Sequence, residues 1–277
     1  MKSILKKCIY PLIASIALCG SIFAMPLKKT KADVIPENRY YDAPGIMPAS
    51  DLNETITFSR KEEELIELPY AVPTYYTNTL SNACGPVAGA NVVGYYDKQY
   101  EELIPDYVAY YPANGRYRQP DSTYVPALMQ DLYTLMQTNV VDVGVSVSEC
   151  LSGLREYVTD KNRNITYTDI KTTSFNETAY KNAISNLKPS LLFCSSASLY
   201  FIRNGTSQDE ILHVITSNSH IVVGYGYYKI RYYDENEVNF RTDTYLRVST
   251  GWMTNSTGFL KVNDISWLDD GYVVNIY

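Results

Sequence analysis

Histidine is scarce in this 277-residue sequence, which contains only His213 and His220. No two cysteines are separated by two residues, as they often are in zinc and iron sites. Because such sites usually need several His or Cys ligands at short spacing, we expect no metal centre.

An excess of positive charge is also missing. The chain has 24 Lys and Arg against 30 Asp and Glu, a formal net charge of -6. Nucleic acids and anionic membranes attract basic surfaces. We therefore expect no nucleic-acid partner.

Long hydrophobic runs are absent except near the N-terminus, where a short basic region precedes an apolar run over residues 8–23. This pattern is typical of a secretory signal peptide, which we assign to residues 1–24, with cleavage after Ala24 or, alternatively, Ala32. An uncleaved anchor is the other interpretation, but Pro11 interrupts a run that is barely long enough to span a membrane. We expect a secreted or cell-wall-associated protein with no integral membrane association once the signal is removed.

Cysteine is limited to five residues, two of which lie in the predicted signal peptide. The other three are Cys84, Cys150 and Cys194. Since three thiols cannot all pair with one another, at least one stays free or pairs outside the chain. A free thiol is therefore the first place to look for chemistry.

Two regions follow the signal peptide. Residues 25–68 mix proline with acidic residues and show few periodic apolar positions, so we interpret them as a leader, a linker or a short propeptide. Their charge run at 60–67 (RKEEELIE) is typical of a solvated helix or an edge strand. Residues 69–277 are long enough and apolar enough to form one domain with its own core.

Hydrophobic periodicity in that domain changes from helical to strand-like along the chain. Helices are expected at 84–98, 125–136, 147–158 and 176–187, and strands at 190–195, 211–216, 221–230, 239–248, 259–262 and 272–276. Helices followed by an antiparallel sheet predict an α+β fold, with a cleft between the two halves.

The segment Asn82–Pro86 (NACGP) places a thiol at the start of a buried helix. Pro86 is tolerated in a first helical turn, and a thiolate at Cys84 would be favoured by the helix dipole. His220 begins a core strand and could be directed across the cleft toward that thiol. His213 is interpreted as structural, and the alternative for Cys84 is a small buried apolar residue.

These residues resemble the C39-type group of papain-like cysteine peptidases, whose best-known members remove double-glycine leaders from bacteriocins. The similarity lies in Val72-Pro73, Asn82–Pro86, Asn91, Tyr95–Asp97, Leu154–Tyr157, Lys188-Pro189, His220–Tyr225 and Tyr245–Trp252. The NlpC/P60 and CHAP peptidases are less similar around the cysteine. The resemblance implies a papain-like fold over residues 69–277, in a secreted bacterial enzyme that needs no cofactor and acts on a peptide or protein substrate.

Two positions depart from the pattern of that group. Where the family has a Gln that donates to the oxyanion, this chain has Asn78, which is one methylene shorter. Where the family has an Asp or Asn that orients the histidine, this chain has the hydroxyls of Ser249 and Thr250. Asp243 is a second candidate for the orienting carboxylate.

We therefore expect Cys84 to attack a peptide carbonyl while His220 carries the proton, and the Cys84 amide with Asn78 to bind the oxyanion. The alternative is a catalytically weak or inactive papain-like protein. Its cleft, in a chain with 27 tyrosines, would bind peptides or proteins without cleaving them.

Overall fold

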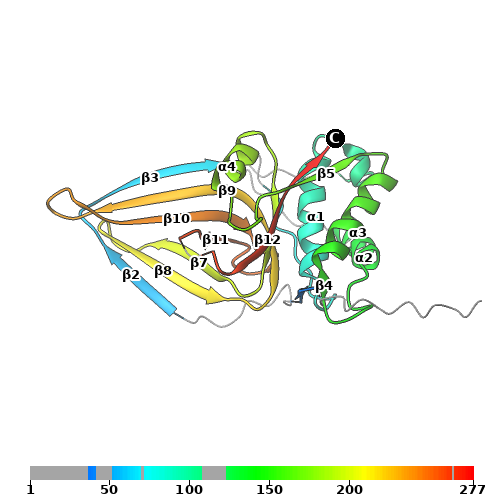
Figure 1. The fold of residues 1–277 in the computed structure, drawn as a ribbon, viewed down its shortest axis with the longest axis horizontal. Coiled ribbons are helices and arrows are strands. Elements are labelled where there is room, and N and C mark those ends of the chain that lie inside the picture. Colours follow the sequence, from blue (N-terminus) through cyan, green and yellow to red (C-terminus); the bar gives the residue numbers. More distant parts are fainter. Residues whose placement is uncertain (1–36, 42–51, 70–71, 108–122, 264) are drawn as a thin grey trace, which may run out of the picture. The chain divides into compact units, whose positions relative to one another are not determined.

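Four α-helices and a ten-stranded antiparallel sheet make up most of the described chain (Figure 1). The computed structural model describes residues 37–41, 52–69, 72–107, 123–263 and 265–277, which belong to one unit that starts at Glu37. The predicted signal peptide and both candidate cleavage positions lie outside these residues. No helix in these ranges is long and apolar enough to cross a membrane.

The helices begin and end close to the positions expected from periodicity. They are α1 (Cys84–Asp97), α2 (Tyr124–Leu135), α3 (Val147–Asp160) and α4 (Glu177–Ser185), with a short 3-10 turn at η1 (Glu101–Leu103). The start of α3 is fixed by a reciprocal capping box between Ser146 and Glu149, and the Asn176 side chain caps α4.

The strands fall into two sheets. The small sheet pairs β1 (Arg39–Tyr40) with β4 (Val145–Ser146), and the large one contains β2 (Leu52–Thr57), β3 (Arg60–Glu67), β5 (Ile165–Asp169), β6 (Ser190–Cys194), β7 (Ser198–Asn204), β8 (Asp209–Thr216), β9 (His220–Tyr233), β10 (Asn239–Ser249), β11 (Thr257–Lys261) and β12 (Leu268–Ile276). All pairings between these strands are antiparallel. The described chain is thus a mixed α and β structure compatible with the expected α+β class.

The long strand β9 organises the large sheet. Its first part pairs with β6 and its second part with β3, while β10 lies along its other side. Every residue of β6 is buried, as its continuous apolar run predicts. Figure 1 shows α1, α2 and α3 grouped together at one end of this sheet.

The unit extends farther toward the N-terminus than the boundary we expected at residue 69. Part of the expected leader, residues 52–67, forms β2 and β3, which pair with β8 and β9. The charge run forms strand β3. Its side chains form ion pairs with residues far along the sequence: Arg60 with Glu237, and Lys61 with Glu210. These partners are distant in sequence, so the local pattern gave no sign that the segment belongs to the sheet.

Helix α1 lies at the centre of the packing, because all of its residues are buried. Gly85 permits a close approach at the start of the helix: a Cβ there would lie 2.6 Å from Val145 Cγ1 and 3.5 Å from Ile221 Cδ1. The start of α1 is therefore wedged between β4 and the beginning of β9.

Candidate functional site

Cys84 is the first residue of α1, as the sequence predicts. The residue before the helix is Ala83, whose side chain cannot cap it, and Pro86 contributes no N–H to the first turn. Asn82 precedes them with a positive φ of 53°, and its amide group donates to Asn139 Oδ1 at 3.1 Å. The thiol therefore lies at the positive end of the helix dipole.

His220 is the first residue of β9, and its ring is held on two sides. Its Nε2 lies 2.8 Å from the main-chain oxygen of Thr250. Its face stacks on Trp252, with ring centroids 5.3 Å apart and planes inclined by 16°. Gly251 links these two partners with a φ of +75°, a conformation that favours glycine.

Cys84 and His220, the candidate pair, lie where α1 packs against β9. On one side, Gly85 approaches Ile221. On the other side, a Cβ on Gly251 would lie 2.9 Å from Val87 Cγ1, so the turn that holds His220 rests on the first turn of α1. Each member of the pair exposes only 1% of its surface.

The Thr250 carbonyl determines which nitrogen of His220 is basic. A carbonyl oxygen only accepts hydrogen bonds, so Nε2 must carry the proton in this contact. In the neutral ring the lone pair is then on Nδ1. Nδ1 is therefore the atom that can accept a proton from a thiol.

The hydroxyls expected to orient His220 are directed elsewhere. Ser249 Oγ donates to the Pro73 carbonyl at 3.0 Å. Thr250 Oγ1 donates to the Asn255 carbonyl at 2.9 Å and accepts from the Trp252 amide at 3.2 Å. Thr250 does hold His220, but through its main-chain oxygen rather than its side chain.

Asp243, the alternative orienting carboxylate, lies in a different part of the sheet. It forms ion pairs with Arg241 and Lys261, each at 2.8 Å. Asp243 faces Ile230 in the register of β10 and β9. At about 3.3 Å per residue, that position is roughly 30 Å along β9 from His220, so Asp243 cannot orient its ring.

Asn78, the candidate oxyanion donor, is exposed to solvent. It lies in a turn in which Thr77 Oγ1 accepts hydrogen bonds from the amides of Thr79 and Leu80. The structure therefore places Asn78 on the surface, whereas it buries the candidate pair.

The other two thiols lie near Cys84. Burial raises the pKa of both Cys150, on α3, and Cys194, at the end of β6. Nearby negative charge adds to the rise, from Cys84 and Glu149 at Cys150 and from Asp269 and Cys84 at Cys194. Cys194 also faces His220 in the register of β6 and β9. All three cysteines are buried and free of disulfides, and no set of His, Cys, Asp or Glu in the described ranges could hold a metal ion.

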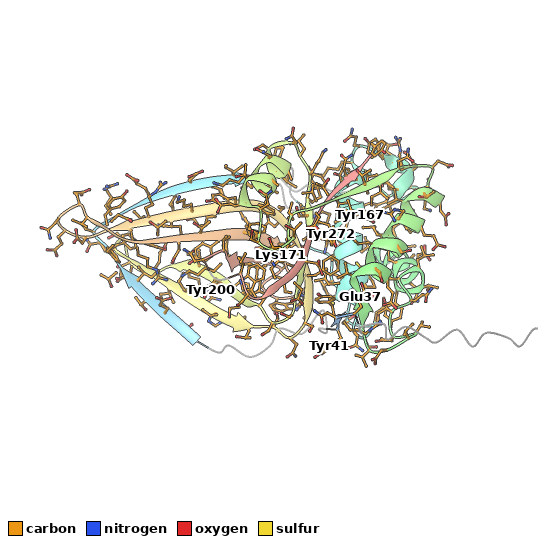
Figure 2. All side chains as sticks on the ribbon, viewed as in Figure 1. Glu37, Tyr41, Tyr167, Lys171, Tyr200 and Tyr272 are labelled. Carbon is orange, nitrogen blue, oxygen red and sulfur yellow. The ribbon has the colours of Figure 1, made fainter. Side chains whose placement is uncertain are left out.

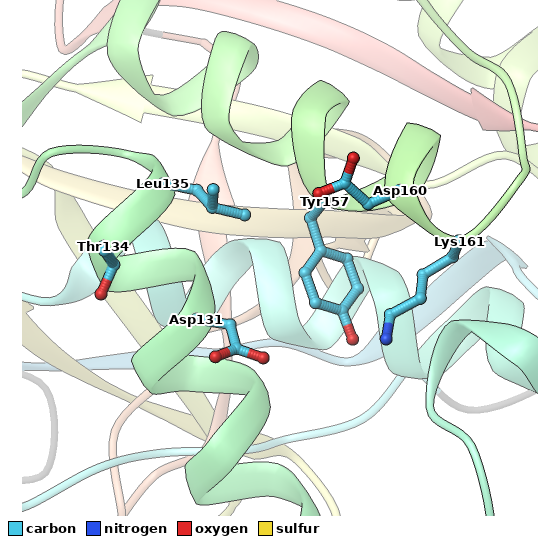
Figure 3. A pocket seen from close by; sticks show the side chains of 6 residues that line it. All are labelled: Asp131, Thr134, Leu135, Tyr157, Asp160 and Lys161. Carbon is cyan, nitrogen blue, oxygen red and sulfur yellow. The ribbon is translucent and has the colours of Figure 1, made fainter.

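A pocket of about 280 Å³ lies between α2 and α3 (Figure 3). It is lined by Asp131, Thr134, Leu135, Tyr157, Asp160 and Lys161. Neither member of the candidate pair lines it, so this pocket is not the cleft expected around them. The pair itself is almost fully buried.

Two partners of His220 were not assigned from the sequence. Trp252 lay in a segment that carries the resemblance, but nothing in the residue type indicated stacking on the histidine. A main-chain acceptor leaves no signal in the residue types of the sequence.

Comparisons with protein-family models, with curated proteins and with solved structures each found no match.

Proposed function

We propose that this chain is a secreted cysteine peptidase with a papain-like arrangement, similar to the C39-type group. The observation that carries the proposal is the hydrogen bond from His220 Nε2 to the Thr250 carbonyl. This bond leaves the lone pair of the neutral ring on Nδ1, which can then act as the base. This histidine begins the strand that packs against the helix headed by Cys84. The proposal includes export by way of the N-terminal signal segment.

The proposed reaction is acyl transfer. His220 Nδ1 accepts the thiol proton, and the Cys84 sulfur attacks the carbonyl carbon of a peptide bond. The C–N bond then breaks as His220 gives its proton to the leaving amine. Water, deprotonated by the same nitrogen, hydrolyses the thioester and releases Cys84.

The start of α1 is the proposed site of oxyanion stabilisation. Main-chain amides at a helix N-terminus point toward developing negative charge, and the Cys84 amide is the nearest such donor. Asn78 remains the candidate for a second donor, but its exposed side chain must turn inward when substrate binds.

The imidazolium formed during the reaction has no carboxylate among its two observed partners. The Thr250 carbonyl supplies a partial negative charge, and the face of Trp252 supplies a cation–π contact, worth about 0.5–2 kcal/mol in proteins. These are weaker than the charge of an Asp. We therefore expect low but real peptidase activity.

A different function, binding of peptides without cleavage, is favoured by one observation. Cys84 and His220 are almost fully buried while Asn78 is exposed, so the reacting groups are not arranged for substrate in this state. A secreted binding protein could keep this fold and use it for recognition alone.

Hydrolysis of a fluorogenic peptide library would separate the two functions. We expect Cys84→Ala and His220→Ala to remove activity, with losses of about 100-fold or more, because each removes a group that acts in the reaction. The matched control is His213→Gln, since this histidine bonds to Asn53 on β2 and should leave turnover unchanged. Wild-type activity no higher than that of Cys84→Ala would favour the binding function.

A further inference from the structure

The segment Glu37–Tyr41, which we call the strap, crosses from the helices to the sheet beside the candidate pair. Within it, β1 pairs with β4 in the antiparallel register Arg39 to Ser146 and Tyr40 to Val145. Figure 2 shows Glu37 and Tyr41 in this region, near the boundary between the helices and the sheet. The strap is bound as an extended peptide that adds a strand.

Two charged side chains anchor the strap to the start of α3. Arg39 donates to the carbonyl oxygens of residues 142–144 at 2.8–3.1 Å and forms a 3.0 Å ion pair with Glu149. Glu37 accepts from the amide and the hydroxyl of Ser148 at 3.0 and 2.7 Å. Burial raises the pKa of Glu37, but these hydrogen bonds outweigh that effect and hold the pKa below its usual value.

Tyr40 is the third anchor, and its side chain is completely buried. Its ring meets the edge of Phe193, with centroids 5.3 Å apart, and its hydroxyl donates to Asp269 at 3.0 Å. The site of Tyr40 thus combines an aromatic wall with a carboxylate at its far end. This chemistry selects a phenol over an aliphatic side chain.

The strap is connected to the surroundings of both Cys84 and His220. Val145, the partner of Tyr40, is the residue that packs on Gly85, next to Cys84. The Tyr41 amide donates to the Ser219 carbonyl, next to His220, at 3.2 Å. The strap therefore contacts the residue next to His220 directly and approaches the residue next to Cys84 through Val145.

We propose that the strap fills a peptide-binding groove that leads to Cys84 and His220, and that this groove selects an extended peptide with an arginine followed by a tyrosine. Its identity as the substrate groove rests on the proposed peptidase function. While the strap is bound, it shields the thiol in cis. Four of its five side chains meet polar or charged partners: Glu37 meets Ser148, Arg39 meets Glu149, and Asn38 and Tyr40 both meet Asp269. β4 supplies the main-chain pairing that any extended peptide could use.

The first test measures how fast iodoacetamide alkylates Cys84, with the site identified by mass spectrometry. Arg39→Ala removes the anchor from the strap. Glu149→Gln weakens the same contact from the other side, while its amide oxygen can still accept from the Ser146 amide in the capping box. We expect each change to raise the alkylation rate about tenfold or more, equivalent to about 1.4 kcal/mol.

The matched control is Arg203→Ala, which removes an exposed arginine on β7, outside the strap and its partners, and should leave the rate unchanged. Thermal melts establish that each variant is folded. Folded variants that react no faster than wild type would overturn the proposal, as would faster reaction of Cys150 or Cys194 than of Cys84.

The second test supplies the groove with a peptide in trans. A labelled, end-blocked Glu-Asn-Arg-Tyr-Tyr peptide should bind the Arg39→Ala protein by fluorescence anisotropy and slow alkylation of Cys84. A peptide with Glu in place of Arg should do neither, because it would face Glu149 and the carbonyl oxygens that hold Arg39. Equal behaviour of the two peptides would refute the selectivity.

Neither readout requires hydrolysis, so the two proposals can fail separately. If the peptide binds and protects Cys84 but no variant cleaves any substrate, the groove stands and the peptidase function fails. If peptides are cleaved while strap variants and wild type react alike, the peptidase stands and the groove proposal fails.

Discussion

At the scale of single residues, His220 is oriented by an atom that a side-chain substitution does not remove. Its Nε2 donates to the carbonyl of Thr250, while the Thr250 hydroxyl bridges Asn255 and Trp252 within the same turn. The side chain thus shapes the turn, and the main chain of that turn contacts the imidazole. These two roles of one residue can be separated by mutation.

We predict that Thr250→Asp does not raise turnover, although it adds a carboxylate at the position where the sequence resemblance led us to expect one. An ionised Asp cannot donate to the Asn255 carbonyl, and this buried site would repel its charge. We expect lower activity and a loss of stability of about 1–3 kcal/mol, measured as kcat/KM and by denaturant unfolding. Thr250→Ser, which keeps the hydroxyl, is the control; a tenfold gain for the Asp variant would contradict this account.

The sequence predicted the positions of Cys84 and His220 in the fold better than the partners of His220. Cys84 starts α1 and His220 starts β9, as expected from a thiol before Gly-Pro and a histidine before an apolar strand. The Thr250 carbonyl could not be found, since every residue carries one. Asn78 and the Ser249 and Thr250 hydroxyls were chosen by their spacing from the pair, which does not specify where a side chain points.

At the scale of elements, the turn between β10 and β11 couples His220 to α1. Gly251 adopts a φ of +75°, and a Cβ there would meet Val87 Cγ1 at 2.9 Å. The same residue joins the acceptor and the stacking partner of His220. The conformation of one glycine therefore sets two contacts of the imidazole.

We predict that Gly251→Ala lowers kcat/KM more than its effect on stability accounts for. The left-handed backbone costs a non-glycine residue about 1 kcal/mol, and the clash with Val87 should push the turn away from α1. Activity and melting temperature should be measured on the same preparation. Gly205→Ala, in an exposed turn, is the control. Full activity in a Gly251→Ala protein would show that the turn does not position His220.

Elements with strong local signals were predicted, and those that depend on distant partners were not. Three of the helices have apolar periodicity, α1 is buried on all sides, and two of the four begin at side-chain caps. In contrast, β3 is mostly charged and β1 is only two residues long. Such strands are stabilised mainly by the strands they join, β9 and β4, which local patterns do not reveal.

At the scale of the whole molecule, the N-terminal part of the described chain is integrated with the C-terminal sheet. β2 pairs with β8, and β3 pairs with β9, across more than half of the sequence. The expected domain boundary at residue 69 followed a change in composition, but a polar segment still belongs to a fold when its backbone pairs with a core strand. The strap is a second polar segment that belongs to the fold through its backbone, because its strand β1 pairs with β4 beside the candidate pair.

The free energy of unfolding of the whole protein should also depend on pH through Asp97, the last residue of α1. Burial raises its pKa to about 7, the hydrogen bond from the Ile104 amide opposes that rise, and the charges of Glu101 and Glu102 add to it. In the unfolded chain the pKa returns to about 3.9. At pH values between these two pKa values the folded protein binds more protons than the unfolded chain. The contribution of Asp97 to the free energy of unfolding is therefore fully present below pH 4 and is lost as pH rises toward 7.

We predict that Asp97→Asn stabilises the protein at pH 8 and has little effect at pH 4. The asparagine oxygen can still accept from the Ile104 amide at the 2.8 Å position of Asp97 Oδ1, while the buried charge is gone. Allowing for screening by solvent, we expect about 1 kcal/mol at pH 8, or a rise of a few degrees in melting temperature. Asp160→Asn, at the exposed end of α3, controls for the loss of one negative charge. A gain of equal size at both pH values would mean that ionisation of Asp97 is not its cause.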